Sequence, residues 1–134
     1  MIKIFLKYSL LAAIIWTLII FILCCTPGKY VPTAHWLELL SFDKFVHASI
    51  FFTLTCLWLL VGFKVNKLSV FSVIFIIFGC VAYGGLLEIM QATVFSQRSG
   101  DWFDFMANTF GCLMGWWFFS KKKGHLKKYR NNVL

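Results

Sequence analysis

Four apolar runs that carry no formal charge constrain the fold of this chain more than any other feature of its sequence. They extend over residues 8–28, 45–63, 68–87 and 105–120. An α-helix rises about 1.5 Å per residue, so a bilayer crossing takes roughly 20 residues. The first three runs have that length, and the fourth reaches it if Trp102, Phe103 and Asp104 join the helix. We therefore expect transmembrane helices over about residues 8–25, 44–63, 68–90 and 102–120.

The composition excludes a water-soluble or disordered chain. Hydrophobic residues make up 60% of the 134 residues and charged residues 13%, against about 45–50% and about 25% in average soluble domains. A soluble domain of this size buries only part of its surface, and disordered chains are poor in apolar side chains. We expect one all-α membrane domain over residues 1–120, a bundle of four transmembrane helices, followed by a mobile basic tail over residues 121–134.

The distribution of Lys and Arg predicts how the helices are oriented. If both termini are cytoplasmic, ten of the thirteen cations lie on the cytoplasmic side, and Lys29, Lys44 and Arg98 lie outside. Cytoplasmic loops carry the excess of Lys and Arg, so we expect an N-in, C-in topology. The first run lacks an A-x-A-like cleavage site, and we expect it to be retained. In the first outer loop, residues 36–40 have the pattern of a short interfacial segment. The basic tail suits anionic lipid rather than nucleic acid.

All five acidic residues fall on the predicted outer side, and four of them share a helix face with other polar residues or with glycines. Positions three or four residues apart lie on one face of a helix. Three faces carry the pattern: Asp43 and His47 in the second helix, Gly84, Glu88 and Gln91 in the third, and Asp101, Asp104, Asn108, Gly111 and Gly115 in the fourth.

These three faces are expected to converge. A charge in a membrane is best tolerated where it faces other helices and is paired or hydrated. Gly111 and Gly115 allow a neighbouring helix to approach closely, so the polar half of the same stripe should also face protein. A purely structural role would explain some of these polar residues. Asp43 and Asp101 are placed to cap their helices, and His47 taken alone is typical of a hydrogen-bonded buried histidine.

Two residues do not fit this structural alternative. Asn108 lies about two turns inside its helix, where it cannot act as a cap. Glu88 lies near the end of its helix, where a carboxylate opposes the helix dipole. We therefore expect a polar site at the outer ends of the second, third and fourth helices.

In these residues the chain resembles the VanZ-like family of small bacterial membrane proteins. The pattern is Asp43-Lys44-x-x-His47, then Gly84-x-x-x-Glu88-x-x-Gln91, then Arg98-x-x-Asp101-x-x-Asp104-x-x-x-Asn108-x-x-Gly111, over roughly residues 40–118. The loop at 93–97 lacks the proline that relatives often have. The resemblance implies a multi-pass protein of the bacterial cytoplasmic membrane and, through the family's namesake, an association with low-level resistance to the glycopeptide antibiotic teicoplanin.

Three kinds of function fit the pattern. The first is a non-enzymatic outer-leaflet site that binds a lipid-linked cell-envelope intermediate or an amphiphilic antibiotic. The charged groups of the site have a net charge of −2 with neutral histidine, which favours an amine or another cation. Lys44 and Arg98 can still clamp an anionic group locally.

The second is a membrane-embedded hydrolase or transferase in which His47, Glu88, Asp101 and Asp104 serve as acid–base groups or as ligands of a divalent metal ion. The third is a small ion- or proton-coupled transporter, because acidic residues within membranes often form relays. The sequence identifies neither a cofactor nor a reaction, and it leaves homo-oligomerisation open.

Overall fold

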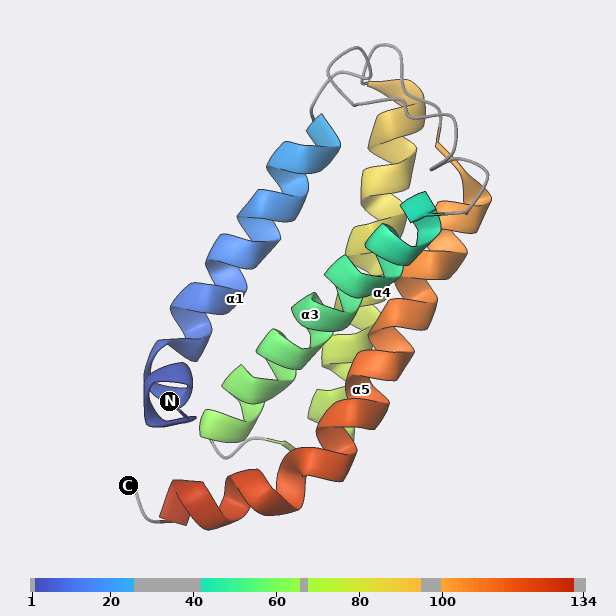
Figure 1. The fold of residues 1–134 in the computed structure, drawn as a ribbon. Helices are drawn as coiled ribbons and strands as arrows, with labels where there is room; N and C mark the ends of the chain where they lie inside the picture. The colour runs from blue at the N-terminus through green and yellow to red at the C-terminus, as the bar shows by residue number, and fades with distance from the viewer. Residues whose placement is uncertain (1, 26–41, 66–67, 95–99, 132–134) are drawn as a thin grey trace.

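The computed structural model describes residues 2–25, 42–65, 68–94 and 100–131. These ranges form the helices α1 (Ile2–Cys25), α3 (Phe42–Lys64), α4 (Val70–Thr93) and α5 (Trp102–Asn131), and they contain no strand (Figure 1). Three of the helices are long and apolar enough to cross a membrane, with candidate spans Leu6–Cys25, Asp43–Lys64 and Val70–Thr93. The expected all-helical fold is confirmed for the described residues. The predicted interfacial segment at residues 36–40 lies outside them.

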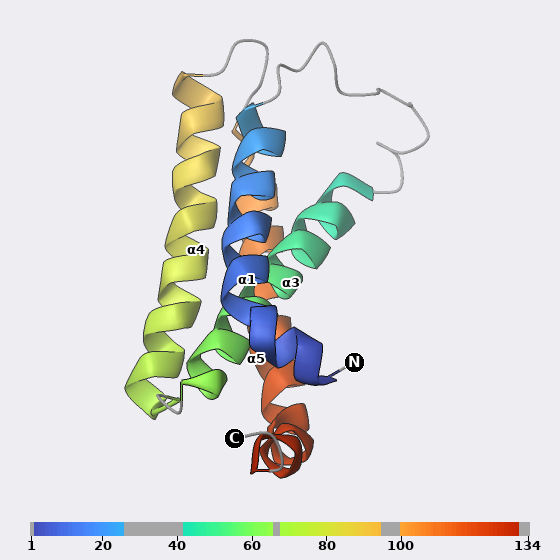
Figure 2. The same cartoon turned by 90° about the vertical axis from the view of Figure 1, so that its left-hand side faces the viewer.

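The helix bounds agree with the expected ones within a few residues, except at the two chain ends. Helix α1 already begins at Ile2 rather than near residue 8, and α5 continues to Asn131 rather than ending near residue 120. The expectation that the helix ends before the basic segment is therefore wrong. Lysine is a good helix former, and its charge is favourable near a helix C-terminus. Figures 1 and 2 show that the last part of α5 turns away from the bundle axis.

Helices α3 and α5 approach each other closely because glycines of α5 face the backbone of α3. A Cβ atom on Gly115 would lie 2.8 Å from the carbonyl oxygen of Phe52, and one on Gly111 would overlap the carbonyl of Ala48. Gly84 of α4 is similarly confined, since its Cβ would lie 3.0 Å from the ring of Phe51. Small residues permit such close helix contacts, which supply most of the packing energy between helices in lipid.

Helix α1 packs against α3 and α4 and is joined to both by hydrogen bonds (Figures 1 and 2). The indole N–H of Trp16 donates to the carbonyl of Ile50 at 3.1 Å, and the indole N–H of Trp58 donates to the hydroxyl of Thr17 at 3.3 Å. The hydroxyl of Tyr83 donates to the carbonyl of Thr17 at 2.8 Å. The polar tips of these aromatic side chains are therefore satisfied within the bundle.

The surface of the bundle exposes many large apolar side chains, more than is usual for a soluble protein of this size. Phe71, Phe75 and Phe78 of α4 are 86%, 77% and 69% exposed. The buried side chains form two layers: Ile20, Phe51, Leu54, Cys80, Leu87 and Cys112 in one, and Leu6, Leu59, Phe63 and Phe119 in the other. Exposed apolar side chains on this scale indicate contact with membrane lipid.

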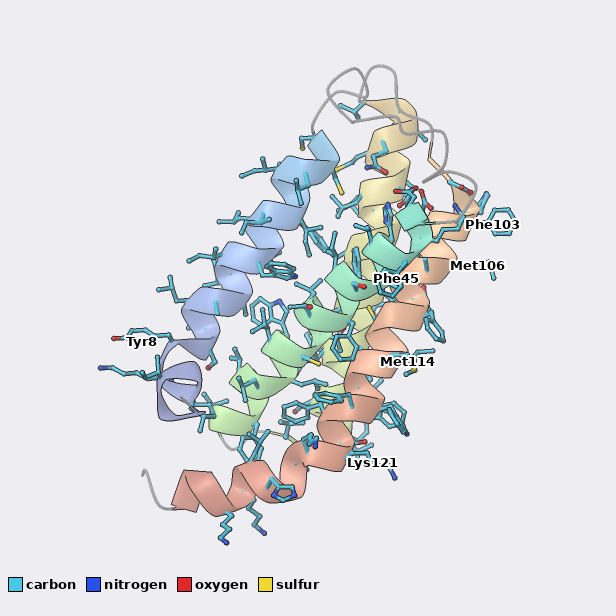
Figure 3. All side chains as sticks on the ribbon, viewed as in Figure 1. Tyr8, Phe45, Phe103, Met106, Met114 and Lys121 are labelled. Atoms are coloured by element: carbon cyan, nitrogen blue, oxygen red, sulfur yellow. The ribbon has the colours of Figure 1, made fainter. Side chains whose placement is uncertain are left out.

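Charges of opposite sign gather at opposite ends of the described bundle. The ammonium group of Lys64, at the end of α3, donates to the carbonyl of Lys7 near the start of α1 at 2.9 Å. Figure 3 shows Lys121 of α5 toward this end and Phe103 at the other, and Asp101 and Asp104 lie on either side of Phe103 in the sequence. The two ends of the described bundle therefore differ in charge.

The contact at Gly111 makes a direct prediction about stability. Replacing Gly111 with Ala should lower the free energy of unfolding by about 1–3 kcal/mol, because a methyl group must be forced against the α3 backbone. Gly79→Ala is the matched control, since nothing lies within 4 Å of a Cβ at Gly79, and we expect it to change stability by less than about 1 kcal/mol. Unfolding in mixed detergent micelles measures both. Equal stability of the two variants would contradict the close approach of α3 and α5.

Candidate polar site

Seven polar residues from three helices gather at the end of the bundle where α3 begins and α4 ends. We refer to them as the polar cluster: Asp43, Lys44, His47, Glu88, Asp101, Asp104 and Asn108. The spacing of these residues along each helix turns their side chains toward the other two helices. The convergence expected from the three helix faces is therefore present in the structure.

Lys44 joins α3 to the start of α5. Its ammonium group lies 3.1 Å from a carboxylate oxygen of Asp101 and 3.0 Å from one of Asp104. The ammonium also lies 5.9 Å from the centre of the Phe103 ring. Because Asp104 is only 13% exposed in its side chain, its charge needs this compensation more than that of an exposed carboxylate does.

A chain of side-chain hydrogen bonds connects all three helices beneath Lys44. Nδ1 of His47 lies 3.0 Å from the side-chain oxygen of Asn108, and the amide nitrogen of Asn108 donates to Glu88 at 3.5 Å. Since the amide nitrogen faces Glu88, the amide oxygen faces His47 and accepts a hydrogen bond from the Nδ1–H group. Asn108 is only 1% exposed, and both ends of its amide have partners.

Asp101 caps α5 and belongs to the polar cluster at the same time. Its carboxylate accepts a hydrogen bond from the backbone N–H of Phe103 at 2.9 Å, and its own backbone N–H donates to Glu88 at 3.2 Å. The Phe103 N–H, and after it the Lys44 ammonium, hold the pKa of Asp101 below its ordinary value. The capping role and the role in the cluster are therefore compatible.

Two glycines that the sequence analysis did not single out shape this end of the bundle. A Cβ on Gly100 would lie 2.7 Å from the carbonyl oxygen of Glu88, so the chain entering α5 passes directly over α4. A Cβ on Gly85 would lie 3.2 Å from the ring of Phe105. The position of Gly100 directly before a helix-capping Asp is the one sequence signal that points to a tight entry into α5.

A groove of about 320 Å³ lies between the end of α4 and the start of α5. Apolar atoms form most of its walls, and two acidic residues of the cluster, Glu88 and Asp101, are among its lining residues. Its lining residues are Gly85, Glu88, Ile89, Ala92, Gly100, Asp101, Trp102 and Phe105. Trp102 is 81% exposed, so the groove is open to the surface of the bundle beside this residue.

The remaining residues of the expected site lie around the cluster or outside the described structure. Gln91 is 5% exposed and lies on the same face of α4 as Glu88, about one turn further along. Gly84 lies one turn before Glu88 and faces α3 and α5. Arg98 lies outside the described residues, so its predicted place in the site stays a prediction.

Comparison with protein-family models, with curated proteins and with solved structures gives no match for this chain. The resemblance to the VanZ-like family therefore rests on the motif residues alone.

The capping carboxylate predicts a dependence of stability on pH. Because the pKa of Asp101 is lower in the folded protein, its ionised form stabilises the fold above the ordinary pKa of about 4, and this contribution is lost as pH falls through the lowered pKa. Asp101→Asn keeps the cap but does not titrate. The melting temperature of the wild type should exceed that of this variant near pH 6, and the difference should shrink below about pH 4. A difference independent of pH would contradict the assignment.

The Lys44 contacts predict a second, non-additive effect. Lys44→Met leaves the buried carboxylate of Asp104 without its ammonium and should cost about 1–3 kcal/mol of unfolding free energy. Adding Asp104→Asn should recover part of that loss, because the uncompensated charge is gone. Lys121→Met removes an exposed ammonium toward the other end (Figure 3) and serves as the control. Additive losses in the double variant would show that Lys44 and Asp104 are not coupled.

Proposed function

We propose that all four helices cross the bilayer and that both termini are cytoplasmic. The separation of Lys7, Lys64 and Lys121 from the acidic end supports this topology, because excess Lys and Arg mark the cytoplasmic side. The apolar part of α5, residues 102–120, runs beside α3 and supplies the fourth crossing. In this orientation the polar cluster and the groove lie at the outer leaflet.

Within this topology, we propose that the protein is a VanZ-like membrane protein that binds an amphiphile bearing an amine. The single observation that carries the proposal is the groove, which combines apolar walls with the carboxylates of Glu88 and Asp101. The described cluster holds four carboxylates and one ammonium, a net charge of −3 with neutral histidine. The Lys44 ammonium is already shared between two carboxylates, so the remaining negative charge favours a cationic headgroup.

The amphiphile has two sources that share this chemistry. One is a lipid or lipid-linked component of the cell envelope with an amine in its headgroup. The other is an amphiphilic antibiotic of the glycopeptide type, such as teicoplanin, as the family resemblance implies. Both would place an apolar chain along Ile89, Trp102 and Phe105 and an amine near Glu88, in a bacterial cytoplasmic membrane.

The interior below the cluster does not favour the transporter alternative. Directly beneath Asn108 the helices are packed with Phe51, Leu54, Leu87 and Cys112, each 2% exposed or less. A proton or ion relay needs a succession of polar groups or water, whereas these four side chains supply none and Thr55, the next residue after Leu54, supplies a single buried hydroxyl. A binding site open to the outer leaflet needs no such path.

Photolabelling tests the proposed amine site. The probe is a long-chain alkylamine with a photoreactive group in its chain, added to protein in lipid nanodiscs. We expect labelling of the α4 and α5 segments that line the groove, and about tenfold weaker labelling in Glu88→Gln, because a charge-assisted hydrogen bond of about 1.5 kcal/mol or more is lost. Lys121→Gln is the control, because Lys121 does not line the groove and lies toward the other end of the bundle (Figure 3).

Two further arms identify the ligand class and its source. An alkyl sulfate of equal chain length should label the groove weakly, and equal labelling by the two probes would overturn the proposal. Competition by phosphatidylethanolamine identifies a lipid source, and competition by teicoplanin identifies the antibiotic. Full labelling of Glu88→Gln would contradict the role of this carboxylate.

A further inference from the structure

We propose that Asp43, His47 and Asp104 form a binding site for one divalent metal ion, with Zn²⁺ the best fit. Nε2 of His47 lies 3.7 Å from a carboxylate oxygen of Asp43 and 3.8 Å from one of Asp104. One ligand atom from each residue lies within 4.8 Å of the other two. None of the three residues lines the groove, so the metal site and the proposed amine site use different residues as direct ligands.

The distances within this triad suit a bridging ion better than direct hydrogen bonds. Hydrogen bonds of this type measure about 2.7–3.2 Å, which is shorter than both separations. Ligands about 2.0–2.2 Å from a tetrahedral ion lie roughly 3.3–3.6 Å from one another. Small side-chain rotations of His47 and the two aspartates therefore complete the coordination.

The orientation of the imidazole ring is the observation that separates this triad from a mere group of acids. The Asn108 oxygen accepts a hydrogen bond from Nδ1 of His47, and Glu88 fixes the orientation of the Asn108 amide. In the neutral ring, Nε2 is then left with its lone pair directed at two carboxylates. This arrangement is favourable only if a cation occupies it, either a metal ion or a proton on Nε2, and titration with metal distinguishes the two. A partner on the other ring nitrogen is also the usual second shell of a metal-bound histidine.

The carboxylates are held in the same manner. One oxygen of Asp104 accepts from the Lys44 ammonium at 3.0 Å, and its other oxygen is the one that faces His47. Asp43 shares a face of α3 with His47, and its side chain is 66% exposed, which gives an ion a route from solvent. Asp43 thus forms the side of the triad that is open to solvent. His47 and Asp104 form the inner side and are held by hydrogen bonds to Asn108 and Lys44.

The donor set indicates the kind of metal. One imidazole nitrogen with two carboxylate oxygens suits borderline ions such as Zn²⁺ and Mn²⁺, whereas Ca²⁺ and Mg²⁺ prefer sites made of oxygen alone. Three protein ligands leave a fourth position of Zn²⁺ open to water or to an oxygen donor. This open position gives the lipid hydrolase alternative a chemical basis in the described residues.

Titration of purified, chelator-treated protein in detergent with ZnCl₂ tests the site. We expect one equivalent of Zn²⁺ to bind, with at least about tenfold weaker binding in Asp43→Asn, which alters an exposed side chain, and in His47→Gln. His125→Gln, which alters an exposed histidine in the basic part of α5, is the control and should bind Zn²⁺ as the wild type does. Substitution with Co²⁺ should give a visible spectrum that the Asp43→Asn variant lacks.

Two outcomes would overturn the metal site. One is the absence of stoichiometric Zn²⁺ binding by the wild type, which would instead make His47 an imidazolium that pairs with the surrounding carboxylates. The other is unchanged Zn²⁺ affinity in Asp43→Asn. Because Glu88→Gln tests the amine site and Asp43→Asn tests the metal site, failure of one proposal is distinguishable from failure of the other.

Discussion

The close contact between α3 and α5 at Gly111 is the constraint on which the polar cluster depends. Because no side chain separates the two backbones there, the helices stay near enough for short polar groups to meet. From Gly111 toward the start of α5, Asn108 lies about one turn away and contacts His47. Asp104 lies about one turn beyond Asn108 and contacts Lys44. A side chain in place of this glycine would separate both contacts together. Packing in the middle of the bundle thus positions the polar side chains of the cluster at its end.

The cluster shows how polar groups are accommodated in an otherwise apolar protein. Hydrogen bonds are stronger in surroundings of low dielectric constant, and unpaired polar groups are correspondingly costly there. Asn108 meets this requirement by bonding to His47 and Glu88 at once, and Asp101 meets it by combining a helix cap with a pairing to Lys44. The interactions that stabilise the fold are therefore the same ones that hold the carboxylates in position for the proposed ligand.

Much of this arrangement follows from spacing along single helices, whereas the pairing between helices does not. The stripe from Asp104 to Gly115 is predictable because residues three and four apart share a face. In the proposed metal site, Asp43 joins His47 and Asp104 as the third ligand. That combination depends on how α3 is rotated and how deep it lies against α5, which cannot be predicted from one sequence. The entry into α5 over Gly100 and the continuation of α5 to Asn131 likewise depend on local backbone geometry.

Solid-state NMR of the protein in lipid bilayers, with ¹⁵N-histidine and ¹³C-asparagine, measures the alignment of α3 and α5 most directly. We expect Nδ1 of His47 to carry a proton and to couple to the side-chain carbon of Asn108, because Nδ1 lies 3.0 Å from the amide oxygen. A folded protein in which His47 shows no coupling to Asn108, or in which Nδ1 is unprotonated, would contradict the convergence of the three helices on one polar site.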